Sequence, residues 1–214
     1  MKVVEIFKSI DGEGKRAGLP TTFIRLFGCN LNCSYCDTRY GCEGEEYSVL
    51  SIAEVIEAVE NIGINSVTIT GGEPLIHSGI NKLIDSLLEK GYWVNIETNG
   101  SQYLGKFIVN PLLFFTMDYK CPSSGMENHM DCRNFELLSK NDVLKFVVGS
   151  QEDLDKSLQI IEQYNPQAQI YFSPVFNKIE PKEIVEYLLD HKMYNCKVQV
   201  QLHKIIWNPN ERGV

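Results

Sequence analysis

Apolar residues recur along this chain with two different periods, and their alternation predicts strands and helices in turn. Spacings of three and four positions mark four helices, at about 51–61, 79–90, 150–164 and 181–192. The first of these opens with Ser51 and Glu54 at the spacing of a capping box, and Gly91 stops the second. Short apolar runs predict strands at 3–7, 21–27, 66–70, 92–97, 113–118, 142–148, 169–172 and 197–202.

The order of these elements predicts an α/β fold. Strands that alternate with helices form a mostly parallel sheet with right-handed crossovers. A closed barrel of this kind takes ~250 residues, whereas this chain has 214, so we expect an open or partial (β/α) barrel. No linker, repeat or low-complexity tract divides the sequence, which predicts a single domain over 1–214. Segments 99–111 and 120–141 lack helical periodicity and are expected to be loops around a site.

Composition and charge narrow the class of protein. Hydrophobic residues make up 43% and charged residues 22% of the chain, as in ordinary globular proteins. The formal net charge of −8 argues against binding nucleic acid through its phosphates, so a small-molecule substrate is expected. No apolar run approaches the ~20 residues of a membrane span, and no secretory signal is apparent, so we expect a cytoplasmic protein.

Three of the seven cysteines, Cys29, Cys33 and Cys36, lie within eight residues, so one short loop can bring their sulfurs to one metal centre. Structural zinc sites and closed iron–sulfur clusters take four protein ligands. Three cysteines on a 4Fe-4S cluster would instead leave one iron open to a ligand that is not protein. A zinc knuckle and ordinary buried thiols are the alternatives. Unpaired thiols are expected for the remaining cysteines, namely Cys42, Cys121, Cys132 and Cys196.

Polar residues gather where the predicted strands end, and in barrel-like α/β folds ligands bind at those ends. These segments are Thr70-Gly71-Gly72-Glu73-Pro74, Glu97-Thr98-Asn99-Gly100, Asp118-Tyr119-Lys120, Ser173-Pro174 and His203-Lys204. Gly71 and Gly72 carry no Cβ and so let the backbone come close to a ligand. Taken singly, a Gly-Gly or Asn-Gly pair is an ordinary turn. Five polar strand ends beside a three-cysteine loop together predict a functional site.

The cysteine spacing C-x-x-x-C-x-x-C, with Tyr35 just before the last cysteine, resembles the signature of the radical S-adenosylmethionine superfamily. The resemblance implies that the methionine part of the cofactor binds the open iron and that its reductive cleavage gives a 5′-deoxyadenosyl radical. Residues 71–74 match letter for letter the segment that binds the cofactor's amino group in that superfamily. Glu97 resembles its ribose-binding carboxylate, the alternative being a solvated strand end.

A narrower resemblance covers nearly the whole chain and points to the family of 7-carboxy-7-deazaguanine synthases of the queuosine pathway. It is carried by Ser9 to Gly14, Arg25, Cys36-Asp37-Thr38, residues 120–125, residues 201–204 with Trp207, and Arg212-Gly213-Val214. The family resemblance implies a carbon–nitrogen lyase that converts 6-carboxy-5,6,7,8-tetrahydropterin to 7-carboxy-7-deazaguanine. Hydrogen abstraction at C6 and loss of ammonia belong to that reaction. The implied cofactors are a 4Fe-4S cluster, S-adenosylmethionine and Mg²⁺.

The same resemblance implies roles for individual residues. Cys29, Cys33 and Cys36 would hold the 4Fe-4S cluster, and Thr38 would bind Mg²⁺ through its hydroxyl. The implied substrate-binding residues are Ile10, Asp11, Gly12, Glu13, Arg25, Thr70, His203 and Val214, the last through a terminal carboxylate. The implied cofactor-binding residues are Tyr35, Asp37, Gly72, Glu73, Glu97, Asp118, Lys120 and Ser173. The alternatives are a surface charge for Arg25, a turn residue for Thr38 and a packed side chain for His203.

The resemblance also suggests a homodimer and a reductant such as flavodoxin or ferredoxin. Two other functions are compatible with the cysteine motif. One is an activating enzyme that installs a glycyl radical on a partner protein, in which Arg25 and residues 11–14 and 212–214 have no evident use. The other is a non-catalytic metal-binding module. Asp118 and Tyr119 depart from the Ser-Pro found in many relatives.

Overall fold

The computed structural model describes residues 1–209 and 211–214. In these residues the centre of the molecule is one sheet of nine strands, in the order β3-β1-β2-β4-β5-β6-β7-β8-β9. The strands are β1 (Lys2–Ile10), β2 (Pro20–Leu26), β3 (Ser48–Val49), β4 (Ser66–Gly71), β5 (Trp93–Thr98), β6 (Leu113–Tyr119), β7 (Val143–Val148), β8 (Gln169–Pro174) and β9 (Cys196–Val198). Pairs from β2 to β9 are parallel, and β1 runs antiparallel to both its neighbours. The mostly parallel, open sheet confirms the predicted fold class.

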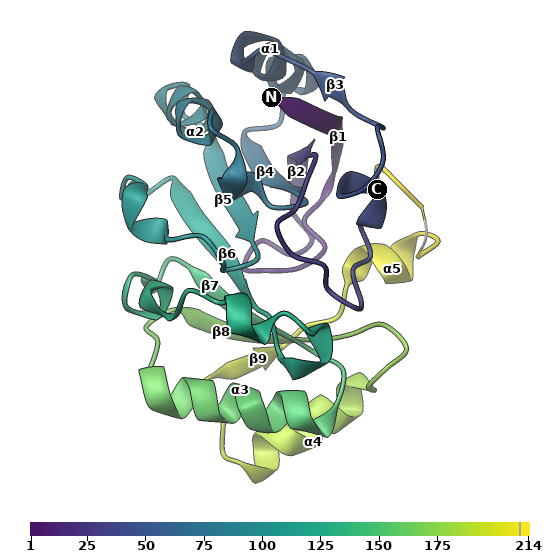
Figure 1. Ribbon diagram of the computed structural model, residues 1–214, viewed down its shortest axis with the longest axis vertical. Coiled ribbons are helices and arrows are strands. Elements are labelled where there is room, and N and C mark those ends of the chain that lie inside the picture. Colours follow the sequence, from purple (N-terminus) through teal and green to yellow (C-terminus); the bar gives the residue numbers. More distant parts are fainter. Residues whose placement is uncertain (210) are drawn as a thin grey trace.

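Helices cover the outside of the curved sheet (Figure 1). The first two, α1 (Ile52–Ile62) and α2 (Ile80–Glu89), contact β1 and β5 respectively. The next two, α3 (Gln151–Tyr164) and α4 (Pro181–Asp190), contact the other end of the sheet at β7, β8 and β9. These four confirm the predicted helices to within two residues at either end. The capping box of α1 is also present, because Ser51 Oγ accepts from the Glu54 N–H while the Glu54 carboxylate accepts from Ser51 N–H.

The strands are apolar because both of their faces are covered. Leu26, Ile69, Ile96 and Leu144 are fully buried in β2, β4, β5 and β7. Strands buried on both faces read as continuous apolar runs rather than as alternating ones. Because the strands from β2 to β9 run parallel, their carboxyl ends meet along one edge of the sheet. Four of the five predicted polar segments lie along that edge, and His203-Lys204 does not.

The last strand is shorter than predicted. Strand β9 ends at Val198, and residues 202–206, which were expected partly as strand, form the short helix α5 (Leu202–Ile206). The chain leaves the sheet because Gln199 is held by the N-terminal turn: its side-chain oxygen accepts from Gly14 N–H at 2.8 Å and its amide donates to Gly14 O at 2.9 Å. Leu202 N–H then donates to Gly12 O. His203 therefore lies on a helix beside this turn and not at a strand end.

The two segments expected as loops contain short turns of 3₁₀ helix rather than regular elements. These are Leu104–Lys106, Pro122–Ser124, Glu127–His129 and Cys132–Glu136, and two further turns of this kind occur earlier in the chain at Arg39–Gly41 and Pro74–Ile76. The sequence also gave no sign of the two-residue strand β3, which pairs with β1 at the edge of the sheet. Among the described residues, no helix has the length and apolar character that a membrane crossing requires.

Candidate functional site

A cavity of about 980 Å³ opens at the carboxyl ends of the parallel strands. Its walls come from the N-terminal turn, the cysteine loop, the ends of β2 and β4 to β8, and the C-terminal segment. Most predicted site residues line it: Ile10, Gly12, Glu13, Arg25, Cys29, Cys33, Tyr35, Cys36, Asp37, Thr38, Thr70, Gly72, Glu97, Asp118, Lys120, His203 and Val214. Three predicted residues, Asp11, Glu73 and Ser173, are buried behind the lining instead.

The cysteine loop follows β2 and is fixed at both ends by backbone hydrogen bonds. Gly28 N–H donates to Gly41 O at 2.8 Å, and Ser34 N–H donates to Ser124 O at 3.0 Å. Cys29, Cys33 and Cys36 are half-buried, are not in disulfides and line the same cavity. The sequence spacing thus brings three free thiols to one wall, as predicted.

The arrangement of these thiols is compatible with an iron–sulfur cluster. Among the described residues, no three His, Cys, Asp or Glu side chains converge tightly enough to hold one metal ion. A 4Fe-4S cluster needs no such convergence, because each thiolate binds a different iron. The three cysteines, facing a roomy cavity and lacking a fourth member of the motif, fit a cluster with one open iron.

Cys42 is a fourth thiol that lines this cavity, outside the three-cysteine motif. Its thiol contacts the sulfurs of Cys29 and Cys36, and this contact lowers the pKa of both groups. Burial has the opposite effect on Cys33, whose pKa is raised. Low thiol pKa values favour the thiolate form that binds metal. Cys42 lies one residue after the turn Arg39–Gly41, a position that motif spacing does not single out.

Gly71 and Gly72 are required by packing against the cysteine loop. A Cβ on Gly71 would lie 2.0 Å from Leu26 O, and one on Gly72 would lie 2.0 Å from Gly28 O. Gly71 also has φ of +133°, which side chains disfavour. The close backbone approach predicted for these glycines is therefore made to the strand β2 and the loop after it, and it fixes how that loop leaves the sheet.

Glu73 is fully buried, and protein donors surround its carboxylate. Leu75 N–H and Thr98 Oγ1 each donate to Oε1 at 2.9 Å, and Asn99 N–H donates to Oε2 at 2.6 Å. Glu73 thus ties the end of β4 to the end of β5 from behind the cavity. Gly71 and Gly72 of the segment line the cavity, but a direct contact of the Glu73 side chain with a cofactor would require rearrangement.

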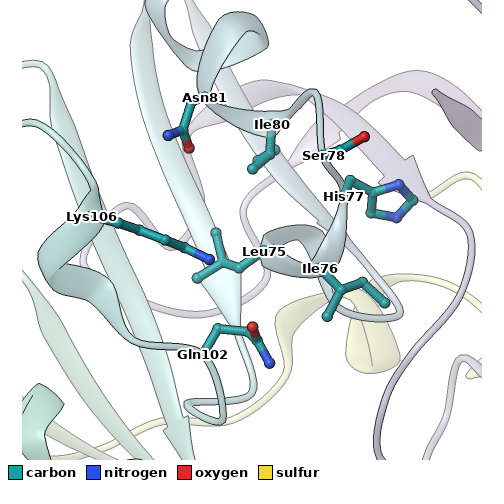
Figure 2. A pocket seen from close by; sticks show the side chains of 8 residues that line it. All are labelled: Leu75, Ile76, His77, Ser78, Ile80, Asn81, Gln102 and Lys106. Atoms are coloured by element: carbon teal, nitrogen blue, oxygen red, sulfur yellow. The ribbon is translucent and has the colours of Figure 1, made fainter.

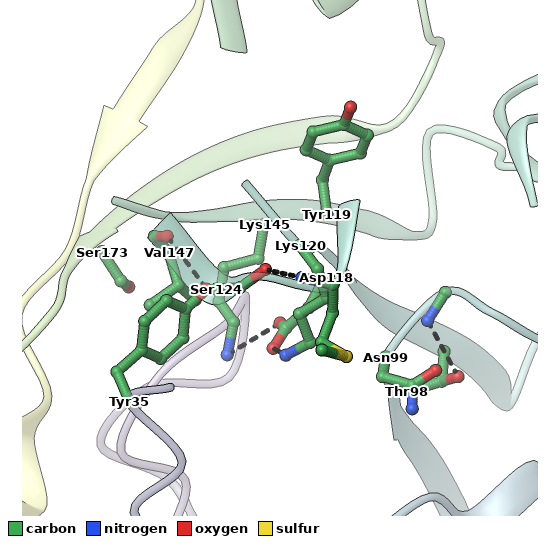
Figure 3. Close-up of polar contacts among 12 residues, drawn as sticks. Tyr35, Thr98, Asn99, Asp118, Tyr119, Lys120, Ser124, Lys145, Val147 and Ser173 are labelled. Atoms are coloured by element: carbon green, nitrogen blue, oxygen red, sulfur yellow. Dashed lines mark hydrogen bonds and ion pairs between the residues drawn. The ribbon is translucent and has the colours of Figure 1, made fainter. Parts of the chain in front are cut away.

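A network of buried charges forms one side of the cavity. Lys145 Nζ lies 3.0 Å from Glu13 Oε2. Figure 3 shows the contacts of Asp118, whose Oδ1 lies 3.1 Å from Lys145 Nζ and whose Oδ2 lies 2.8 Å from Lys120 Nζ. Ser173 Oγ donates to Glu13 Oε1 at 2.7 Å. Ser173, predicted to bind the cofactor, therefore reaches the cavity only through Glu13.

Lys145 joins the predicted substrate and cofactor residues, yet the sequence analysis missed it. Burial alone would lower the pKa of its ammonium, but the carboxylates of Asp118, Glu13 and Glu97 hold that pKa well above its usual range. The signal was present, because Lys145 is the only charge in the apolar run Val143–Val148. A lone charge in a strand buried on both faces is rarely left without partners.

Asp11 is buried among hydroxyl groups under the N-terminal turn. Its Oδ1 accepts from Thr68 Oγ1 at 2.8 Å. Arg16 Nε lies 3.3 Å from Oδ2, but without the geometry of a hydrogen bond. Burial raises the pKa of the Asp11 carboxyl to about 7. The substrate contact predicted for Asp11 would therefore have to come from its backbone or follow a rearrangement.

Further predicted residues that line the cavity have partners within the chain. Arg25 Nε is paired with Glu5 Oε1 at 2.6 Å. Thr38 Oγ1 donates to Asp37 Oδ1 at 2.9 Å, and Lys204 Nζ reaches Asp37 Oδ2 at 3.0 Å. His203 packs on Gly12, where a Cβ would lie 2.3 Å from its Nδ1. Helix α5 thus depends on a glycine in the N-terminal turn.

A smaller hollow of about 320 Å³ lies apart from these residues, between the start of α2 and the turn at Leu104–Lys106 (Figure 2). Leu75, Ile80 and Lys106 are among its lining residues. It contains none of the predicted site residues.

Comparison with known proteins identifies the family. Residues 23–107 match the model of the Radical SAM superfamily. The chain is 48% identical to 7-carboxy-7-deazaguanine synthase of Clostridium acetobutylicum, over 100% of this chain and 99% of that protein. It is 37% identical to the enzyme of the same name from Chlorobaculum tepidum, over 100% and 97%. The fold also matches the crystal structure of QueE from Escherichia coli, with a TM-score of 0.76 at 24% identity over 94% and 93% of the two chains. This chain therefore belongs to the 7-carboxy-7-deazaguanine synthase family, within the radical S-adenosylmethionine superfamily.

Proposed function

We propose that this protein converts 6-carboxy-5,6,7,8-tetrahydropterin to 7-carboxy-7-deazaguanine with loss of ammonia. The observation that carries the proposal is that three unpaired cysteines, Arg25 and Glu13 share one cavity in a chain of this family. A cluster site alone would fit many reactions. The Arg25 guanidinium and the Glu13 carboxylate line the same cavity, and they add the groups that a carboxylated pterin requires.

The cysteine wall supplies the cofactor half of the site. A 4Fe-4S cluster and S-adenosylmethionine would bring reductive cleavage of a carbon–sulfur bond and a 5′-deoxyadenosyl radical. Cys29, Cys33 and Cys36 hold the cluster in this proposal. The nucleoside is received by residues of the cysteine loop and of the strand ends, two of them, Asp118 and Lys120, from the charged network: Tyr35, Asp37, Gly72, Glu97, Asp118 and Lys120. Glu97 suits the ribose hydroxyls because a carboxylate only accepts hydrogen bonds.

The opposite wall receives the pterin. Arg25 uses Nε for its ion pair with Glu5, and its planar fork offers further donors suited to a substrate carboxylate. Glu13 accepts from the ring's N–H groups, while Lys145 and Ser173 fix its carboxylate. Ile10, Gly12, Thr70, His203 and Val214 complete this wall. The buried position of Asp11 gives it a supporting role beneath the turn.

Further parts of the proposal extend to metal, partners and cellular location. Thr38 gives its hydroxyl to Mg²⁺, with water and substrate as the other ligands, as suits a hard cation. The chain acts as one domain, works as a homodimer in the cytoplasm and receives electrons from a small reductant such as flavodoxin or ferredoxin. The family relationship is the support for these points.

The proposal is tested by anaerobic reconstitution of the cluster, followed by incubation with the carboxytetrahydropterin, S-adenosylmethionine, Mg²⁺ and dithionite. Formation of 7-carboxy-7-deazaguanine, followed by liquid chromatography and mass spectrometry, is the expected result. Cleavage of S-adenosylmethionine without any deazapurine would point instead to a glycyl-radical activating enzyme. Bound zinc with no inorganic sulfide would leave a metal-binding module.

A further inference from the structure

Asn99 lies between the cysteine loop and the Gly-Gly-Glu-Pro segment, in a position that neither motif includes. It follows β5 directly and is 7% exposed, beside Thr98 (Figure 3). Its side-chain amide nitrogen Nδ2 donates to Cys29 Sγ at 3.7 Å, a normal distance for a sulfur acceptor. Among the described residues, Asn99 is the one whose side-chain amide donates a hydrogen bond to a predicted cluster ligand.

The orientation of this amide is fixed by its surroundings. Asn99 Oδ1 accepts from Ser101 N–H at 3.0 Å, so the oxygen must face the backbone of its own turn. The nitrogen then faces two acceptors, Asn30 Oδ1 at 3.1 Å and Cys29 Sγ. A flipped amide would place its oxygen against Asn30 Oδ1 and its nitrogen against the Ser101 N–H, losing both hydrogen bonds. The N–H therefore points at the sulfur.

The backbone of Asn99 is held equally firmly. Its N–H donates to Glu73 Oε2 at 2.6 Å, and Thr98 Oγ1 donates to the other oxygen of the same carboxylate. Glu73 therefore connects the Gly-Gly-Glu-Pro segment to Asn99, and Asn99 connects to the cysteine. This chain of contacts gives the buried Glu73 a function that needs no contact between its carboxylate and the cofactor.

A hydrogen bond to a thiolate ligand changes the electronics of an iron–sulfur cluster. It withdraws charge from the sulfur and so stabilises the reduced cluster, which carries one more negative charge. The reduction potential rises as a result, and electron transfer into the cluster becomes easier. Leu31 N–H also donates to Cys29 Sγ, at 3.5 Å, but that donor belongs to the backbone and is independent of residue type.

We propose that Asn99 is a positioning residue that sets the reduction potential of the 4Fe-4S cluster through its hydrogen bond to Cys29, and that Glu73 holds Asn99 in place. The inference rests on the cluster of the proposed function but not on the identity of the substrate. It applies to the resting cluster before any substrate binds, so it can be tested without turnover.

The test compares the midpoint potentials of wild-type protein and the Asn99→Asp variant by redox titration followed by electron paramagnetic resonance. Iron and sulfide are measured in each reconstituted sample. The variant keeps the size of the side chain, retains an oxygen for Ser101 N–H and replaces the donor to sulfur by an acceptor. We expect full loading and a shift of the midpoint to more negative potential.

Two further variants separate electronic from structural effects. Asn99→Leu removes the donor without adding a charge, and its midpoint should lie between those of Asn99→Asp and the wild type. Ser101→Ala alters the same turn but keeps the backbone N–H that orients Asn99, so its midpoint should equal that of the wild type. An unchanged midpoint in both fully loaded Asn99 variants would overturn the proposal. Failure of the wild-type protein to bind iron and sulfide would instead refute the proposed function.

If the Asn99 variants do not take up the cluster, the wild-type protein still provides a test. Exchange into D₂O should shift the iron–thiolate stretching bands in resonance Raman spectra of wild type, and Glu73→Gln should reduce that shift while retaining the cluster. An identical isotope response in wild type and Glu73→Gln would contradict the role given to Glu73 and Asn99.

Discussion

The two walls of the cavity are prepared to different degrees. On the charged wall, Glu13, Asp118, Lys120 and Lys145 satisfy one another through ion pairs of 2.8 to 3.1 Å. On the cysteine wall, the three thiols of the motif are free, half-buried and dependent on Cys42, Asn99 and backbone groups for their polar contacts. The charged residues pair with one another in the folded chain. The thiols would instead gain their main partners from a bound cluster.

Because of this difference, substitutions on the two walls should have different consequences for folding and for cluster binding. Residues of the charged wall support folding as well as binding, because removing one partner leaves another charge buried and unpaired. Removing one of the half-buried thiols leaves no buried charge without its partner, so we expect it to change stability less. Substitutions in the charged network should therefore reduce stability more than cluster loading, and substitutions of the motif cysteines should reduce cluster loading more than stability.

The largest effect is expected from Cys36→Ala. Loss of one of three ligands should abolish cluster retention and bring deazapurine formation to background, while the free energy of unfolding of the apoprotein changes little. Iron and sulfide analysis with chemical denaturation of the apoprotein measures both. Cys196→Ala, which removes a thiol away from the cavity, is the control and should load normally. Normal loading of Cys36→Ala would contradict the assignment of the cluster.

Lys145→Met should show the opposite pattern. Removing a buried ammonium leaves Glu13 and Asp118 uncompensated, so the free energy of unfolding should fall by about 3 kcal/mol, while the cluster still assembles. The KM for the pterin should rise about tenfold or more, since a charge-assisted hydrogen bond contributes roughly 1.5–3 kcal/mol. Lys145→Arg should recover stability in part. If Lys145→Met lowered the iron content as strongly as it raised the KM, the result would contradict the distinction between the two walls.

Thr38→Ala is expected to act at the boundary between the walls. If its hydroxyl binds Mg²⁺, the variant should need several-fold more Mg²⁺ for deazapurine formation. Reductive cleavage of S-adenosylmethionine should remain largely intact, because the Thr38 N–H that contacts Cys36 is unchanged. Titrations of both activities against Mg²⁺ decide the point. Parallel loss of the two activities would argue against the magnesium role.

The final expected effect is a pH dependence of stability. Burial raises the pKa of Asp11 from 3.8 to about 7, so the folded protein retains a proton that the unfolded chain releases. The stability that Asp11 contributes is thus complete below about pH 4 and is lost as the pH rises through 7. Relative to wild type, Asp11→Asn should become more stable across that window, by no more than about 4 kcal/mol. Urea midpoints that differ equally at pH 5 and pH 8 would refute this.

The sequence predicted the parts of the site that depend on local spacing. Cys29, Cys33 and Cys36, the glycines of 71–72 and the polar ends of β5 and β6 all reach the cavity, because apolar runs define the strands and parallel strands place their ends together. The buried positions of Asp11 and Glu73 depend on partners 57 and 26 residues away, at Thr68 and Asn99. Spacing along the chain carries no information on such contacts.

The end of the chain was hardest to predict for a similar reason. Residues after Val198 are apolar enough to continue a strand, but Gln199 and Leu202 make their hydrogen bonds with Gly14 and Gly12 of the N-terminal turn. Long-range contacts of this kind override local preference for strand. The result is a short helix that places His203 against Gly12. His203 therefore lines the cavity from a helix and not from the end of a strand.

The most direct test of the account follows one hydrogen atom from the pterin wall to the cysteine wall. The carboxytetrahydropterin is prepared with deuterium at C6 and turned over by the reconstituted protein, and the recovered S-adenosylmethionine and 5′-deoxyadenosine are analysed by mass spectrometry. The account predicts deuterium in the 5′ position, because a radical formed beside the three cysteines must abstract from a substrate held near Arg25 and Glu13. Cofactor cleavage with no deuterium transferred would contradict it.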